Sequence, residues 1–153
     1  MSNLVFTPID EQGLLIYQTW FNDAELSRRI EPPTRGWFDY VRYEPGYFAW
    51  MIYEDGIAVG QLQLDTYSNR TGSMALVVKP ELRNRGYGTR ILRAFLERAE
   101  VRQLNRIEAT IEPDNIPALH CAKSVGFVQQ SPEPDDEGFL DFVYNREHRD
   151  RPG

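Results

Sequence analysis

Hydrophobic and polar residues follow two different rhythms along the chain, and the change between them is clearest in the middle third. Residues 74–78 are an apolar run with two adjacent valines, which favours a buried strand. Pro80 ends this run because it has no N–H to donate to a continuing ladder. Beyond it, the apolar residues follow the spacing of a core-facing helix, at Ile91, Leu92, Phe95, Leu96 and Ala99. The pattern predicts a strand, a turn and one long helix.

The same rhythms assign residues 1–145 to a single domain and residues 146–153 to a charged tail. Before the central run, the pattern predicts a first strand, two helices and a hairpin that turns at Asp55–Gly56, and Asp10 is a candidate cap for the first helix. After the long helix, it predicts a strand over residues 106–111, a helix over residues 118–125 and two further strands. We expect the strands before the central run to be antiparallel, and strand 106–111 to lie parallel to it.

The turn between the central strand and the long helix is rich in glycine and arginine, with two of each in residues 83–88. Glycine lets a ligand approach the backbone, and the start of a helix adds partial positive charge. The turn therefore reads as a phosphate-binding segment, or else as a glycine-rich connection with solvated arginines. Neither common nucleotide fingerprint fits it: no Gly-Lys-Ser/Thr is present, and Ile91 stands at the third glycine of the dinucleotide pattern.

Charge and composition narrow the class of protein. The net charge of the 153 residues is −6, yet residues 81–106 hold seven arginines against three glutamates, so this segment is +4 and the remainder is −10. A nucleic-acid partner needs a broad basic face, so we expect none. No run reaches the length of a membrane span and no signal peptide is recognisable, which favours a cytoplasmic protein without a membrane partner. With one cysteine and two histidines, we expect neither an internal disulfide nor a metal site.

Two motifs, in order along the chain, resemble the hallmarks of the Gcn5-related N-acetyltransferase (GNAT) superfamily. The first is Arg/Gln-x-x-Gly-x-Gly/Ala, matched by Arg83, Gly86 and Gly88. The second is an asparagine, a small residue three positions on, and Gly-Phe at positions eleven and twelve, matched by Asn115, Ala118 and Gly126–Phe127. The likeness covers roughly residues 47–144. The opening helix loosely resembles the branch that acts on ribosomal proteins and aminoglycosides.

The resemblance implies an α+β fold in α/β/α layers. Its sheet is mixed but mostly antiparallel, with six to seven strands that splay between the fourth and fifth, and about four helices pack on it. Acetyl-CoA, the co-substrate, would lie in that gap. Val77 and Val78 would pair with its pantetheine arm, Asn115 would hydrogen-bond the arm, and Ala118 would flank the thiol. The diphosphate would be held by Arg83, Asn84, Arg85, Gly86, Tyr87, Gly88 and Thr89. Asn115 is also a candidate helix cap.

The activity that the resemblance implies is direct transfer of an acetyl group to a primary amine of a small molecule or peptide. We expect a monomer or homodimer, with a backbone N–H near Val77 or Val78 stabilising the oxyanion. The chain departs from the family at two catalytic positions. Ala122 stands where many members have a tyrosine acid, and Ser73 where some have a glutamate. The alternative is therefore a non-catalytic domain that binds or senses acyl-CoA.

Other side chains are candidates for the missing acid and base. The set is Asp65, Ser73, His120, Cys121 and Tyr144. His120 would titrate near neutral pH, or simply be a surface residue. Cys121 would carry the acyl group, or simply pack the core. The aromatic residues Trp37, Tyr40 and Tyr43 either line an acceptor pocket or pack inside, whereas Trp50 is expected in the core.

Overall fold

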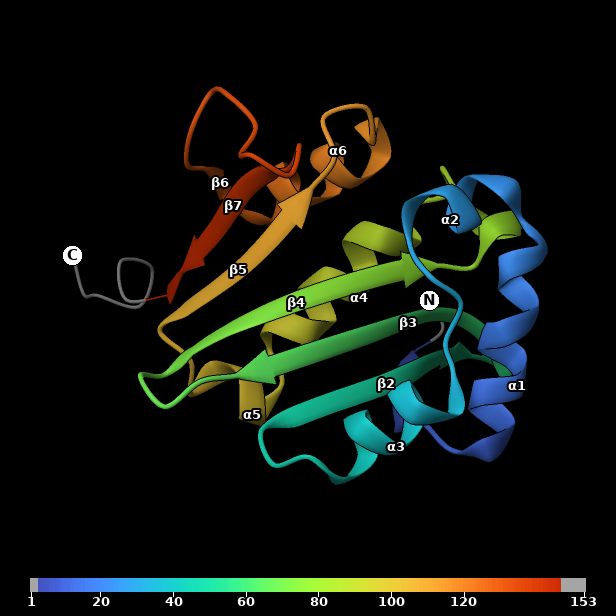
Figure 1. Cartoon of the computed structure of the whole chain (residues 1–153). Helices are drawn as coiled ribbons and strands as arrows, with labels where there is room; N and C mark the ends of the chain where they lie inside the picture. Colours follow the sequence, from blue (N-terminus) through green and yellow to red (C-terminus); the bar gives the residue numbers. More distant parts are fainter. Residues whose placement is uncertain (1–2, 147–153) are drawn as a thin grey trace. The chain divides into compact units, whose positions relative to one another are not determined.

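A computed structural model describes residues 3–146 of the chain. Seven strands form a sheet in the order β1-β2-β3-β4-β5-β7-β6 (Figure 1). The strands are β1 (Leu4–Pro8), β2 (Tyr47–Glu54), β3 (Ile57–Thr66), β4 (Thr71–Val78), β5 (Arg106–Ile111), β6 (Val128–Gln129) and β7 (Leu140–Asn145). The β4–β5 pair is parallel, while the β1–β2, β5–β7 and β6–β7 pairs are antiparallel. This is the mixed α+β sheet expected from the sequence.

Six α-helices and two short 3₁₀ turns connect the strands within residues 3–146. They are α1 (Glu11–Thr19), η1 (Trp20–Asn22), α2 (Ala24–Arg29), α3 (Arg35–Tyr43), η2 (Pro80–Leu82), α4 (Tyr87–Leu96), α5 (Ala99–Arg102) and α6 (Ile116–Val125). Two of the helices, α2 and α5, have only six and four residues. The resemblance implies about four helices. Of the two short ones, α2 is the second helix predicted before the central run, whereas α5 was expected to be part of the long helix.

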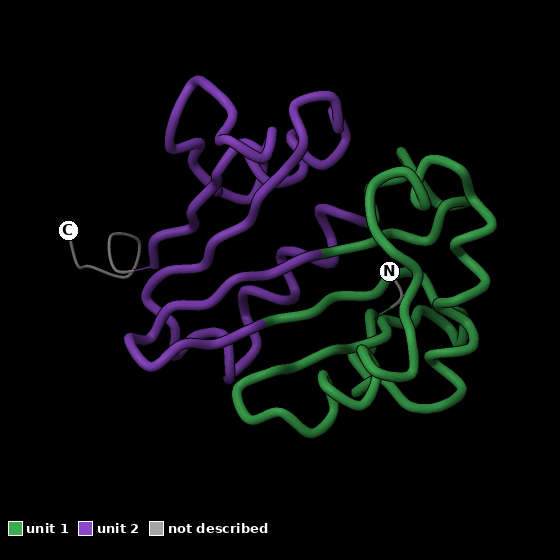
Figure 2. Tube along the Cα trace, in the orientation of Figure 1, with its two compact units in different colours: residues 1–64, 76–87 green, residues 65–75, 88–153 purple. Residues whose placement is uncertain are grey.

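The backbone contacts divide the chain into two compact units, coloured separately in Figure 2. Unit 1 contains residues 1–64 and 76–87, and unit 2 contains residues 65–75 and 88–153. Strands β3 and β4 and helix α4 each contribute residues to both units.

Unit 1 is built on the antiparallel β1–β2 pair, whose register runs from Leu4 opposite Glu54 to Pro8 opposite Trp50. Helix α1 begins after Asp10, whose side chain accepts a hydrogen bond from the Gly13 amide at 2.7 Å, as the sequence predicts. Asp55 and Gly56 make the β2–β3 turn with φ values of 51° and 79°, which is the left-handed pair of a two-residue hairpin.

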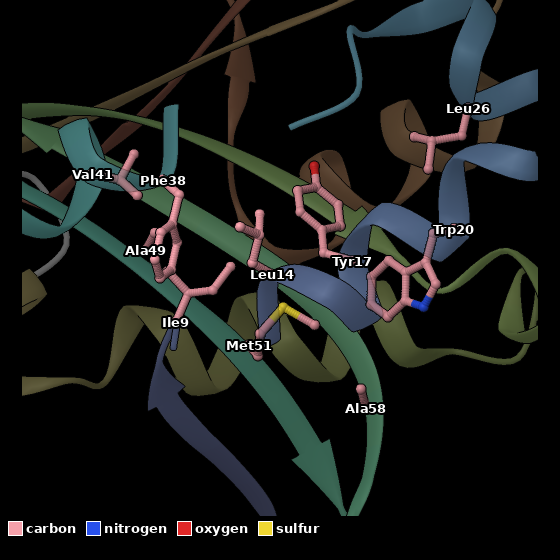
Figure 3. Close-up of a cluster of buried hydrophobic side chains, with 10 residues drawn as sticks. All are labelled: Ile9, Leu14, Tyr17, Trp20, Leu26, Phe38, Val41, Ala49, Met51 and Ala58. Carbon is pink, nitrogen blue, oxygen red and sulfur yellow. The ribbon is translucent and has the colours of Figure 1, made fainter. Parts of the chain in front are cut away.

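The core of unit 1 gathers buried side chains from the helices and from β2 and β3 (Figure 3). Leu14, Tyr17 and Trp20 come from α1 and η1, and Phe38 and Val41 from α3. Trp37 packs against this core, and Trp50 is buried as expected. Tyr40 and Tyr43 are exposed on α3. Of the undecided aromatic residues, only Trp37 therefore contributes to the core.

Unit 2 is built on the β5–β7 pair, in which all six residues of each strand are matched, from Arg106 opposite Asn145 to Ile111 opposite Leu140. Helix α6 ends at Val125 and is capped by Gly126, with φ 108°, and the Phe127 amide donates to the Ala122 carbonyl at 2.9 Å. Arg146, expected in the charged tail, is buried, and its Nη2 donates to the Leu96 carbonyl at 2.7 Å. The other tail residues lie outside the described residues.

The long helix predicted after the glycine-rich turn is broken. Helix α4 ends at Leu96, and α5 begins at Ala99 after Arg98, which has extended backbone angles. Ile91, Leu92, Phe95 and Leu96 are buried as the helical spacing predicts, but Ala99 is exposed. The apolar stripe therefore stops where the first helix stops, because Ala99 belongs to a separate helical turn.

Candidate functional site

The end of β4 contains the two valines that the family resemblance assigns to the pantetheine arm. Val77 and Val78 are half-buried rather than fully buried, and Val77 packs against the core of unit 1. The parallel ladder with β5 matches Thr71–Ser73 with Arg106–Glu108, which are the first three residues of each strand. The pairing thus ends at Ser73, although β4 continues to Val78.

The turn after β4 is exposed and contains two residues with left-handed backbone. Asn84 has φ 63° and Gly86 has φ 85°, and a Cβ built at Gly86 meets no atom within 4 Å. Asparagine and glycine are the residues that tolerate this conformation best. The sequence therefore folds into a sharp bend with open space on its outer side.

Most backbone donors of this turn are unused by the protein. The Arg83 amide makes a long hydrogen bond to the Pro80 carbonyl, at 3.4 Å. Within residues 3–146, the amides of Asn84, Arg85 and Gly86 have no protein acceptor. Helix α4 starts immediately after them, at Tyr87. Several N–H donors and the positive end of a helix thus lie together in sequence, which suits an anion.

Two side chains of the turn are held by acidic residues of unit 1. Arg83 donates from Nη2 to Oδ2 of Asp23 at 2.7 Å, and the Tyr87 hydroxyl donates to Oε1 of Glu54 at 2.5 Å. The hydrogen bond from Arg83 is the main reason that the pKa of the Asp23 carboxyl is lowered, followed by the bond from the Leu26 amide. The sequence gives no signal for either contact.

In unit 2, the start of α4 contacts α6. Gly88 is buried, and the Thr89 hydroxyl lies 3.5 Å from both the Cys121 sulfur and the Ser124 hydroxyl. Cys121 is half-buried and accepts the Thr89 contact. His120, the neighbouring residue on α6, is exposed. Of the two catalytic candidates on α6, Cys121 therefore has a polar partner, the Thr89 hydroxyl, whereas His120 is exposed.

Asn115 caps helix α6. Its side-chain oxygen accepts from the Ala118 amide at 3.4 Å, and its carbonyl accepts from the Leu119 amide at 3.0 Å. Pro117 occupies the first helical turn, where its missing N–H costs least. Asn115 therefore has the capping role considered from the sequence, and the cap uses one of its two polar side-chain atoms, the oxygen.

A cavity of about 420 Å³ lies beside β4, β5 and β7 in unit 2. It is lined by Ser73, Met74, Arg106, Glu108, Ala109, Thr110, Gln130, Asp141, Phe142 and Val143. The Ser73 hydroxyl lies 3.0 Å from the Tyr67 hydroxyl, and Arg106 donates to Glu108 at 3.1 Å. The cavity thus combines two carboxylates, one of them paired with a guanidinium, and the hydroxyl groups of Ser73 and Thr110.

The catalytic candidates Ser73, Tyr144 and Asp65 differ in whether they line the cavity. Ser73 lines the cavity, whereas Tyr144 is paired with Ile107, a buried residue, and so shares its face of the sheet. Because alternate residues of a strand point to opposite faces, Tyr144 points away from Glu108 and Thr110. Tyr144 packs against Phe127 and the Arg146 guanidinium. Asp65 is half-buried at the end of β3 and does not line the cavity.

Sequence reasoning missed the polar residues of the cavity. Glu108, Thr110 and Asp141 were not candidates, although β5 alternates polar Arg106, Glu108 and Thr110 with apolar Ile107, Ala109 and Ile111. That alternation marks a strand with one open face. It is a usable signal, but it does not distinguish a binding face from a solvated one.

Residues 3–146 contain neither a metal-binding cluster nor a membrane-spanning helix. No group of three or more His, Cys, Asp and Glu side chains there is arranged to hold a metal ion. No helix in the same range is long and apolar enough to cross a bilayer. His148, the second histidine, lies outside the described residues.

Comparison with known proteins gives agreeing results. Residues 14–127 match the sequence profile described as the acetyltransferase (GNAT) family. An uncharacterized N-acetyltransferase of Bacillus subtilis (strain 168), YfmK, is 28% identical over 140 residues, which cover 90% of this chain and 94% of that protein.

Two solved structures share the fold at low sequence identity. The aminoglycoside acetyltransferase AAC(6')-Ib in complex with coenzyme A and kanamycin has a TM-score of 0.79 at 16% identity, over 98% of this chain and 100% of that chain. The spermidine N-acetyltransferase of Vibrio cholerae in complex with CoA and spermine has a TM-score of 0.78 at 15% identity, over 94% of this chain and 96% of that chain.

Proposed function

The chain belongs to the acetyltransferase (GNAT) family, and from this premise we propose that it moves an acetyl group from acetyl-CoA directly to a primary amine of a small molecule or peptide. Family membership makes the protein an acyltransferase and acetyl-CoA its co-substrate. We propose in addition the class of the amine acceptor and the residues that bind each substrate.

One observation carries the donor half of the proposal: the exposed turn at residues 84–86 keeps its backbone amides unused. In this proposal the segment from Arg83 to Thr89 holds the diphosphate of acetyl-CoA. The unused amides of residues 84–86 donate to phosphate oxygens, and Gly86 and Gly88 have no Cβ to keep the ligand away. Val77 and Val78 pair with the pantetheine arm through their backbone. Asn115 donates to the same arm from its amide nitrogen while its oxygen caps α6.

The reaction needs an unprotonated amine, since an alkyl ammonium with a pKa near ~10 has no lone pair with which to attack. No strong base lines the unit 2 cavity in the position that family glutamates take, where this chain has Ser73. The Ser73–Tyr67 hydroxyl pair, 3.0 Å apart, offers a hydrogen-bonded path by which water removes the proton. A backbone N–H at Val77 or Val78 stabilises the oxyanion, so positioning supplies most of the rate.

The acceptor amine enters the unit 2 cavity in this proposal. Glu108 and Asp141 offer carboxylates there. Thr110 lies directly opposite Asp141 in the β5–β7 register, so Glu108, two residues before Thr110, is the diagonal neighbour of Asp141. Diagonal neighbours on adjacent antiparallel strands lie about 7–8 Å apart, a spacing that suits two amino groups of one molecule. The kanamycin and spermine of the two structural neighbours carry several amines, which supports an acceptor with more than one positive charge.

The direct test is acetyl-CoA turnover against a set of amines, measured by release of the CoA thiol. The set contains a polyamine, an aminoglycoside, a peptide with a free N-terminus and a simple monoamine. We expect amine-dependent thiol release, fastest with an acceptor that carries several amines. Tight binding of acetyl-CoA without turnover on any amine would instead support the acyl-CoA-sensing alternative.

A second test addresses the acceptor cavity. Asp141→Asn and Glu108→Gln remove one negative charge each and keep the side-chain shape. We expect the KM for a polyamine to rise about tenfold in each variant, because a charge-assisted hydrogen bond is lost, with the KM for acetyl-CoA unchanged. The matched control is Glu133→Gln, an exposed residue of the same unit. Equal polyamine KM values in all three variants would remove the cavity from the proposal.

A further inference from the structure

The turn proposed to hold the diphosphate is fixed at both ends by side chains and left untied in its middle. At its start, Arg83 is paired with Asp23, and at its end the Tyr87 hydroxyl donates to Glu54. Between them, the amides of residues 84–86 have no acceptor within residues 3–146. All of these residues belong to unit 1.

Asp23 is a rigid partner because another contact already holds its carboxylate. It is the N-cap of α2, and its Oδ2 accepts from the Leu26 amide at 2.9 Å as well as from Arg83 at 2.7 Å. The side chains of Arg83 and Asp23 are 32% and 29% exposed, so water screens the pair only in part. One carboxylate thus ties the start of a helix to the start of the turn, 60 positions away along the chain.

Glu54 is placed with similar definition by the β-sheet. It is the last residue of β2, it faces Leu4 in the register with β1, and the tight Asp55–Gly56 turn follows it. Its partner Tyr87 is the first residue of α4 and is half-buried. A strand end therefore fixes the point at which the turn becomes a helix.

Two carboxylates beside a turn that receives a diphosphate are electrostatically unfavourable unless they serve another purpose. The turn contains Asn84 at φ 63°, a left-handed conformation that asparagine tolerates better than most residues. Held donors bind an anion better than mobile ones, because their ordering entropy is already lost before binding.

We propose that Asp23 and Glu54 are positioning residues for the donor site, which hold Arg83 and Tyr87 so that the amides between them converge on the diphosphate. The inference rests on the proposed function, because it assigns the turn to acetyl-CoA. Neither carboxylate touches the cofactor in this proposal. Each acts through its partner in the turn, so its loss changes cofactor binding and leaves the chemical step intact.

The test uses substitutions that remove one tie and little else. Asp23→Asn keeps a good helix cap, since asparagine and aspartate cap equally well, but it loses the ion pair with Arg83. Tyr87→Phe keeps the ring and loses the hydroxyl that reaches Glu54. For each variant we expect CoA, titrated by calorimetry, to bind about tenfold more weakly than to the unchanged protein. The KM for acetyl-CoA should rise in step while kcat stays within about twofold.

The matched control is Glu11→Gln, which breaks another 2.7 Å ion pair of unit 1, with Arg35, away from the turn. Its CoA affinity should equal that of the unchanged protein. Arg83→Lys is the conservative variant: it keeps the charge beside Asp23 and should recover part of the affinity that Arg83→Gln loses. A thermal melt of every variant separates loss of affinity from loss of fold.

The possible results separate the two proposals. If the unchanged protein does not bind CoA, the proposed function fails. If it binds CoA and the Asp23→Asn and Tyr87→Phe variants bind it equally well, only the positioning role fails. Tighter binding by Asp23→Asn also overturns the inference, because the carboxylate would then act mainly by repelling the diphosphate.

Discussion

The starts of helices α4 and α6 differ in what happens to their backbone donors. Before α4, the amides of residues 84–86 have no acceptor within residues 3–146. At α6, Asn115 accepts from the Ala118 amide, and Pro117 has no N–H to offer. Both helices carry the same dipole, but only the first presents a group of unused donors. A helix start is therefore a strong anion site only when its own sequence does not cap it.

The cause of this difference is local sequence. A short acceptor side chain at the cap position, such as that of Asn115, folds back onto the first turn. Gly86 has no side chain to fold back, and its φ of 85° turns the backbone outward into open space. The α6 start is stabilised by the protein itself, whereas in the proposed function the donors of the α4 start are left for the diphosphate of acetyl-CoA. The predictions below test this distinction.

The largest effect is expected from Gly86→Glu. The new side chain must adopt a left-handed backbone, and its negative charge lies where the diphosphate is proposed to bind. We expect the affinity for CoA to fall at least about a hundredfold, measured by calorimetry. Gly56→Glu is the matched control, because Gly56 has φ 79° and equally open surroundings but lies in the β2–β3 hairpin turn.

The control removes the shared cost of backbone strain. Both variants should lose similar stability in a thermal melt, since both force a side chain into the same region of φ. Only the Gly86 variant should lose CoA. Comparable CoA affinity in the two variants would show that the α4 start is not the diphosphate site. The unused amides would then not distinguish the α4 start from the α6 start in function.

A smaller effect is expected at α6. Asn115→Ala removes the cap and should lower the free energy of unfolding by about 1 kcal/mol, measured by denaturant titration. Asn115→Ser should recover most of this loss because serine also caps. If the Asn115 amide also holds the pantetheine arm, the KM for acetyl-CoA should stay raised about tenfold in both variants. A normal KM in the serine variant would assign Asn115 to capping alone.

The fold was predictable from the sequence where the signal is local. The Asp10 and Asn115 caps, the Asp55–Gly56 turn and the Gly126 helix end each depend on a few adjacent residues, and each is present. The helix break at Arg98 was missed because the apolar spacing continues to Ala99, although Arg98 has extended backbone angles.

The candidate site was less predictable because its contacts are non-local. Arg83 and Asp23 are 60 positions apart, and Tyr87 and Glu54 are 33 apart, so no spacing rule connects them. The cavity depends on which residue of β7 faces which residue of β5, and that register cannot be read from either strand alone. The family motifs identified the turn, whereas the contacts of Arg83 and Tyr87 that hold it were found only in the structure.

Lowering the pH should weaken the stabilising contact at the α4 turn but not the cap of α6, and this effect should be smaller than the two above. The contact at the α4 turn contains an ionisable group, Asp23, while the Asn115 cap does not titrate. Hydrogen bonding by Arg83 lowers the pKa of Asp23 below its unfolded value, so its stabilisation is present above that value, near pH ~4, and is lost as the pH falls through the folded pKa. Solvent screening keeps the effect below about 1 kcal/mol.

The measurement is the free energy of unfolding of the unchanged protein and of Asp23→Asn, followed from neutral pH to about pH 3. The advantage of the unchanged protein should shrink as the pH falls below about 4, since the variant has no charge to lose. Asn115→Ser should show no such convergence with the unchanged protein. A constant difference between the unchanged protein and Asp23→Asn over this range would mean that the ion pair with Arg83 contributes nothing to folding.

The smallest effect is expected where the two helices meet in unit 2, at the contact between Thr89 and Cys121. The sulfur lies 3.5 Å from a hydroxyl and is half-buried, which fits a packing role with one weak hydrogen bond. Cys121→Ala should change kcat and the KM for acetyl-CoA by less than about threefold, because direct transfer to the amine uses no protein nucleophile. A loss of several orders of magnitude in kcat, with a burst of thiol release before steady state in the unchanged protein, would instead show that Cys121 carries the acyl group.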